Sequence, residues 1–71
     1  MCKKTDQHER HLSSLNYSNE IVRKRTEEYR KTNDLFIERR CIEDILIELV
    51  EQKYHLTKLL EMTNRDIDSV I

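Results

Sequence analysis

The sequence predicts an all-α protein, either one long helix or a two-helix hairpin, that forms a coiled coil or a helical bundle. Three observations lead to this prediction. The 71 residues include no glycine and no proline, which are the residues that most often interrupt helices. Glutamate, lysine, arginine and leucine are abundant and favour the helix. In the second half of the chain, leucine and isoleucine recur every seven residues, as they do in coiled coils.

Length and composition limit what such a chain can do alone. A chain of 71 residues forms at most one domain. A domain of this size buries little of its surface, so it commonly needs a disulfide, a metal or a partner. Charged residues make up 38% of the chain, and the formal net charge is -1. No overall charge attracts the chain to nucleic acid or to anionic lipid, so we expect partners to recognise a local surface.

The cysteines and the polar N-terminal residues favour a reducing compartment, the cytoplasm or the nucleus. Cys2 falls in a segment that we expect to fray, and Cys41 falls deep in the helical pattern, so we interpret both as free thiols. The first residues are too polar for a signal peptide. The apolar stretch from Cys41 to Leu60 contains several charged residues, so it is not expected to span a membrane.

The first of four predicted segments covers residues 1–12, which we expect to fray. The stretch that follows, Ser13 to Asn19, reads SSLNYSN. Several of these residues prefer helix caps to helix interiors. A reliable helix is therefore predicted only after this stretch.

Residues 13–34 form the second segment, which is predicted to be a charged amphipathic helix. Glu20 with Lys24, and Glu27 with Lys31, have the acid-then-base spacing that stabilises exposed helices. A secondary apolar stripe with seven-residue spacing also begins here. Its members are Leu15, Val22, Tyr29 and Phe36.

Residues 35–62 form the third segment, an apolar coiled-coil helix whose heptad register can be assigned. The a positions are Leu46, Lys53, Leu60 and Ile67, and the d positions are Leu35, Ile42, Leu49, Leu56 and Val70. A polar residue at one a position usually selects register and oligomer order while lowering stability. We therefore interpret Lys53 as a register determinant.

The apolar face of this segment is wider than a two-stranded seam requires. Ile45 and Leu59 fall at g positions and Val50 falls at an e position, where a two-stranded coiled coil usually has charged residues. This width favours a bundle of three or more helices, within one chain or between chains. The predicted partner interface consists of Ile42, Ile45, Leu46, Leu49, Lys53, Leu56, Leu59 and Leu60.

The two apolar stripes would point in different directions on one continuous helix. One solution is a rod ~80 to 90 Å long at 1.5 Å per residue, with a three-residue phase slip or with different partners on its two faces. The other is a hairpin with a break at Lys31 to Asp34, KTND, where Asn33 takes a left-handed conformation and Asp34 caps the next helix. Because this stretch has weak turn chemistry, we favour the rod. The fourth segment, residues 63–71, is expected to be partly helical or frayed.

No catalytic or metal-binding constellation emerges from the sequence. In the motif HERH, His8 and His11 are three residues apart, whereas the zinc-protease motif needs histidines four apart. Cys2, His8 and His11 are too few ligands for a structural metal site. No histidine is placed to act as a base for Cys41. We therefore predict no enzymatic activity, no metal and no cofactor.

The sequence favours a non-enzymatic protein–protein interaction module, a coiled-coil oligomerisation or adaptor subunit of a larger complex. Its partners would be protein helices, from the same or another chain. The alternative is a small nucleic-acid-associated regulator that dimerises through the same helix and uses the basic surface from Arg23 to Lys31. Glu27 and Glu28 interrupt that surface, which makes nucleic-acid binding the weaker interpretation.

Overall fold

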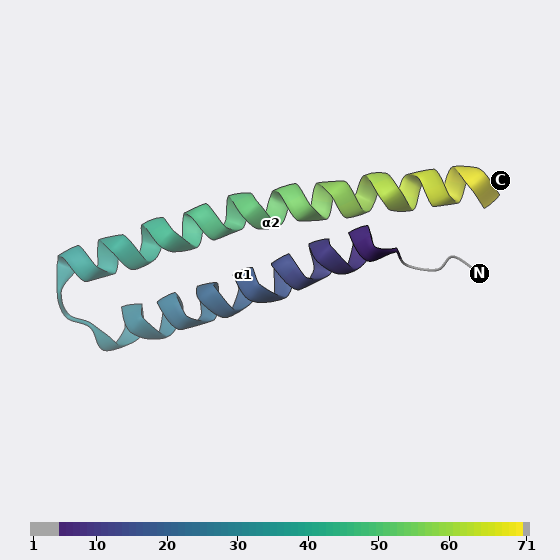
Figure 1. Ribbon diagram of the computed structural model, residues 1–71. Helices are drawn as coiled ribbons and strands as arrows, with labels where there is room; N and C mark the ends of the chain where they lie inside the picture. The colour runs from purple at the N-terminus through teal and green to yellow at the C-terminus, as the bar shows by residue number, and fades with distance from the viewer. Residues whose placement is uncertain (1–4, 71) are drawn as a thin grey trace.

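The structure, a computed structural model that describes residues 5–70, is a hairpin of two helices (Figure 1). Helix α1 spans Asp6–Lys31 and α2 spans Leu35–Val70, with 26 and 36 residues respectively. Within this range there is no strand. The molecule measures 55 × 15 × 14 Å, shorter than the rod of ~80 to 90 Å that a single helix would form at 1.5 Å per residue. The all-α prediction is therefore confirmed; of the two alternatives the hairpin is the one observed, and the preference for a rod is wrong.

Side-chain capping explains how residues 32–34 reverse the chain without glycine or proline. The N–H of Thr32 donates to the carbonyl of Glu28 at 3.0 Å and ends α1. Asp34 then caps α2, because its carboxylate accepts hydrogen bonds from the N–H groups of Phe36 at 2.9 Å and Ile37 at 3.4 Å. The expected cap at Asp34 is present. The expected left-handed Asn33 is not, since no described residue has a positive φ.

Helix α1 begins earlier than the sequence predicted, at Asp6. Thr5 and His8 form a capping box: the Thr5 hydroxyl accepts from the His8 N–H, and the His8 ring accepts from the Thr5 N–H at 3.1 Å. The acidic residues Asp6 and Glu9 in the first turn stabilise the helix, because their negative charges lie at the positive end of the helix dipole. Residues 6–12, for which fraying was expected, are therefore helical, and residues 1–4 lie outside the described part of the chain.

Helix α2 continues through the segment for which partial fraying was expected, as far as Val70. The Ser69 hydroxyl donates to the carbonyl of Arg65 at 3.0 Å, one turn earlier in the helix. Residues 63–70 are therefore helical, and residue 71 lies outside the described range.

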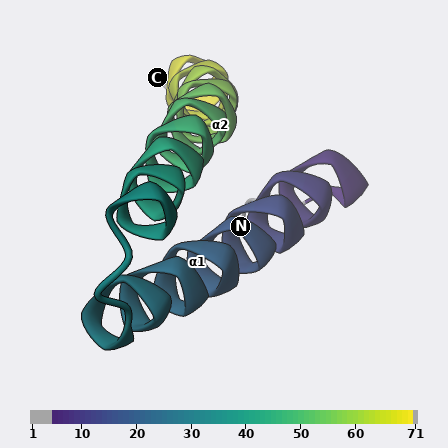
Figure 2. The same ribbon diagram turned by 90° about the vertical axis from the view of Figure 1, so that its left-hand side faces the viewer.

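The two helices pack side by side with inclined axes, as Figure 2 shows from the loop end. Between them lies almost no apolar core. In the described chain only Cys41, 1% exposed, and Ser18, 3% exposed, are buried. The accessible surface is 6235 Å², whereas a globular monomer of 8.7 kDa exposes about 4,700 Å². The hairpin is elongated and keeps most of its apolar side chains in contact with solvent.

Candidate interaction surface

The contact between α1 and α2, the hairpin seam, is formed by residues spaced three and four apart on each helix. This spacing places them on one helical face. The side chains that line it are buried or half-buried and many of them are polar. They are His11, Leu15, Ser18, Val22 and Arg25 of α1, and Cys41, Ile45, Glu48, Gln52, His55 and Leu59 of α2.

A hydrogen-bond network occupies the centre of the seam. The Ser18 hydroxyl donates to the backbone carbonyl of Glu48 at 3.3 Å. The side-chain amide of Gln52 donates to the Ser18 hydroxyl at 3.1 Å and to the Asn19 side-chain oxygen at 3.0 Å. Each such bond contributes about 0.5 to 1.5 kcal/mol net. The network aligns the two helices lengthwise, but it does not supply the driving force that an apolar core would supply.

Two histidines meet further from the loop. The Nδ1 atoms of His11 and His55 are 2.8 Å apart, so one ring nitrogen must donate and the other must accept. Tyr54 packs edge-on against both rings, with centroid distances of 6.3 Å and 5.2 Å. Glu51 lies 3.8 Å from the Nε2 atom of His55. No group of three or more histidine, cysteine or acidic side chains placed to hold a metal occurs in residues 5–70.

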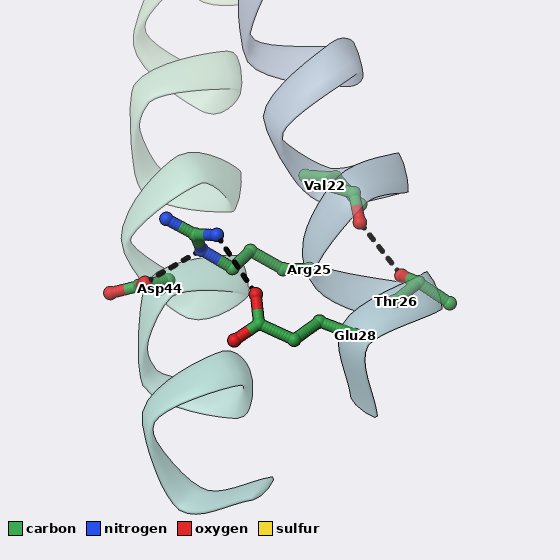
Figure 3. Close-up of polar contacts among 5 residues, drawn as sticks. All are labelled: Val22, Arg25, Thr26, Glu28 and Asp44. Carbon is green, nitrogen blue, oxygen red and sulfur yellow. Dashed lines mark hydrogen bonds and ion pairs between the residues drawn. The ribbon is translucent and has the colours of Figure 1, made fainter. Parts of the chain in front are cut away.

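Near the loop, Arg25 links the two helices (Figure 3). Its Nε donates to Asp44 of α2 at 2.9 Å, and its Nη1 donates to Glu28 of α1 at 3.1 Å. The hydrogen bond to Asp44 raises the pKa of Arg25. Burial raises the pKa of the neighbouring Cys41 thiol, and the negative charge of Glu28 adds to this effect. Cys41 is therefore a protonated packing residue and not an activated nucleophile.

The basic segment of α1 is largely neutralised by its own acids. Glu20 pairs with Arg23 at 2.8 Å, and Glu27 pairs with Arg30 at 3.5 Å. The sequence had assigned these acids to Lys24 and Lys31; the structure pairs them with arginines three residues away. The hydrogen bond from Arg23 lowers the pKa of Glu20.

A cleft beside the loop is lined by both basic and acidic side chains. Basic and acidic side chains of α1 alternate around it, with one apolar residue from α2. Such a surface has no single sign of charge with which to attract phosphate. Its lining consists of Arg23, Lys24, Glu27, Glu28, Lys31, Thr32 and Ile37.

The outer stripe is the main apolar surface of the molecule. Its member Ile42 follows the buried Cys41 directly and therefore lies about 100° around the helix from that seam residue, at 3.6 residues per turn. Its exposed fractions range from 46% at Ile42 to 77% at Leu35. Around Lys53 the stripe forms a shallow groove with Leu49 on one wall. The outer stripe comprises Leu35, Ile42, Leu46, Leu49, Lys53, Leu56, Leu60 and Ile67.

The structure separates the predicted interface residues into two groups. Ile45 and Leu59 are half-buried and belong to the hairpin seam. The other six are exposed and belong to the outer stripe: Ile42, Leu46, Leu49, Lys53, Leu56 and Leu60.

The secondary stripe is divided as well. Leu15 and Val22 are half-buried in the seam, whereas Tyr29 and Phe36 are exposed. Sequence reasoning missed the polar members of the seam, because it searched the heptads for apolar residues. The seven-residue spacing of His11 and Ser18, and of Cys41 and His55 across two heptads, was the available signal.

Neither described helix is long and apolar enough to cross a membrane. The sequence matches no protein-family model. Comparison with curated proteins and with solved structures likewise gives no significant match.

Proposed function

We propose that the chain is a non-enzymatic helix-docking module, an oligomerisation or adaptor unit whose outer stripe binds the helices of protein partners. One observation supports this function above the others: the heptad leucines and isoleucines are exposed, while the seam inside the hairpin mixes apolar side chains with a hydrogen-bond network at its centre. Each Leu or Ile gains roughly 1.5 to 3 kcal/mol when it is fully buried. Association with another helix that buries these side chains would therefore stabilise the molecule.

Nucleic-acid binding has less support. Arg23, Arg25 and Arg30 each have an acidic partner within 3.5 Å. A phosphate would have to compete with these carboxylates, and only the lysines of the segment remain as unpaired cations among its described residues. Such binding would weaken steeply with salt, whereas apolar docking would not. The free thiol of Cys41 fits a reducing compartment, the cytoplasm or the nucleus.

Leu49→Asp tests this function. The substitution places a carboxylate in the middle of the outer stripe, where burial of an unpaired charge is costly. We expect the variant to be a poorly helical monomer by circular dichroism and sedimentation equilibrium. Ile47→Asp is the matched control, because Ile47 is also an exposed apolar residue of α2, 61% exposed, but lies on another face.

The control should keep both its helicity and its mass. If Leu49→Asp leaves both quantities unchanged, the outer stripe is not the docking surface.

A further inference from the structure

We propose that the partner of the outer stripe is a second copy of the same chain, with the two α2 helices antiparallel about a two-fold axis level with Glu51. This inference rests on the proposed docking function and names the occupant of the surface. In such a homodimer the same patch of both copies meets itself, so the patch has to be self-complementary.

The outer stripe has this property about residue 51. Six of its seven apolar members form three pairs at equal distances on either side of that position, and so do Arg39 and Thr63, two of the three polar residues that interrupt the heptads; the third is Lys53. Six apolar residues therefore meet apolar residues, Arg39 meets Thr63, and Lys53 meets Leu49. The facing pairs are Leu35 with Ile67, Arg39 with Thr63, Ile42 with Leu60, Leu46 with Leu56, and Leu49 with Lys53.

Other registers match less well. An antiparallel pairing shifted by one heptad in either direction places Arg39 opposite Leu56 or Val70 of the second copy. It also leaves Leu35 or Ile67 without a facing residue. The register about residue 51 is therefore the one that uses the whole stripe and buries no arginine against an aliphatic side chain.

Lys53 selects the antiparallel sense. In a parallel pair it would face the Lys53 of the second copy, and like charges facing each other destabilise a helix pair. In the antiparallel pair it faces Leu49, and the two lysines are offset along the helices by about 6 Å at 1.5 Å per residue. The aliphatic stem of Lys53 can then cover Leu49 while its ammonium group reaches water.

The exposed area is sufficient for a stable dimer. The seven apolar side chains of the stripe are 46% to 77% exposed. Together they offer on the order of 700 Å² per copy, close to the roughly 800 Å² per partner of a standard interface. Val50, 70% exposed, lies beside the axis and adds a contact with its own copy.

The second copy also explains the position of α1. Ile45, Gln52 and Leu59, which belong to the hairpin seam, are g positions of α2. In an antiparallel pair the g positions of both helices lie on the same face. Both α1 helices therefore lie on that face, next to each other, and the two hairpins form a bundle of four helices.

Disulfide cross-linking of full-length chains tests both the partner and the register. In a Cys2→Ser, Cys41→Ala background, chains with Ile42→Cys are mixed with chains with Leu60→Cys and air-oxidised. We expect mixed 42–60 dimers by mass spectrometry. Two Ile42→Cys chains should not cross-link, because residue 42 lies about 27 Å from its copy at 1.5 Å per residue. The pair Leu35→Cys and Ile67→Cys repeats the test at the ends of the stripe, where a substitution disturbs folding least.

Sedimentation equilibrium of the unmodified chain should give twice the monomer mass. Cross-links of residue 42 to itself would show a parallel dimer and overturn this inference, while the docking function would stand. A poorly helical monomer that folds only with a different helical protein would also overturn the inference alone. A fully helical, thermally stable monomer would overturn both the inference and the proposed function.

Discussion

Ser18, Gln52 and Cys41 illustrate how single residues define the hairpin without stabilising it strongly. Ser18 is small enough to be buried between the helices, and the side-chain amide of Gln52 on α2 donates a hydrogen bond to its hydroxyl. Cys41 is the most buried apolar side chain of the described residues. These three residues determine which faces of α1 and α2 meet, but they remove little apolar surface from water.

At this scale we expect the Cys41 thiol to resist alkylation in the folded protein. Burial raises the pKa of Cys41, and only the thiolate reacts. In a Cys2→Ser variant, the rate of reaction with iodoacetamide should rise at a higher pH than it does for a cysteine peptide. Urea should remove this difference.

The raised pKa of Cys41 also makes the stability of the fold depend on pH. Because the folded-state pKa lies above the unfolded value, the protonated thiol stabilises the fold below the unfolded pKa, and this contribution is lost as pH rises through the folded pKa. Alkylation of the folded protein at the rate of the peptide would contradict the burial of Cys41.

At the scale of the elements, capping decides where each helix begins and where the chain reverses. The capping box of Thr5 and His8 starts α1 ahead of the stretch from Ser13 to Asn19, whose serines and asparagines suggested a later start. The Thr32 N–H makes the last backbone bond of α1, and the side chains of Thr32 and Asp34 accept hydrogen bonds from the N–H groups of Asp34 and Phe36. These caps replace the glycine and proline that hairpin loops commonly contain.

We therefore expect Asp34→Ala to destabilise the hairpin. The substitution leaves the N–H groups of Phe36 and Ile37 without their acceptor, which should lower the free energy of unfolding by about 0.5 to 2 kcal/mol. Urea denaturation followed by circular dichroism measures this change. Asn33→Ala in the same loop is the control and should change the free energy by less than about 0.5 kcal/mol. Equal losses in both variants would show that the cap at Asp34 does not start α2.

At the scale of the whole molecule, the hairpin seam buries little apolar surface and the outer stripe leaves much of it exposed. A chain of this size seldom stabilises itself through its own core. Here the strongest apolar periodicity lies on a face of α2 about 100° around the helix from the intramolecular contact. We therefore propose that assembly buries the surface that the hairpin leaves exposed.

Lys53→Leu should raise the melting temperature of the assembly and reduce its specificity. The variant replaces a charged residue of the stripe with an apolar one, and it removes the like-charge contact that disfavours a parallel pair. Thermal circular dichroism should show the higher melting temperature, and the cross-linking experiment should yield 42–42 dimers as well as 42–60 dimers.

Lys58→Leu is the comparison, because it changes the same residue type on another face of α2, beside Tyr54. A lower melting temperature for Lys53→Leu would place Lys53 outside the interface.

The sequence by itself determined that the chain is helical, which leucines and isoleucines share a face, and where a break could occur. Each of these follows from local propensity or from a spacing of three, four or seven residues. Only the tertiary structure decided that the break at residues 32–34 is a hairpin and that Ile45 and Leu59 belong to its seam. Periodicity shows which side chains lie together on a helix, but what covers them depends on contacts between distant residues. Here many of those contacts are made by polar side chains such as His11, Ser18 and Gln52. A heptad pattern of apolar residues does not include them.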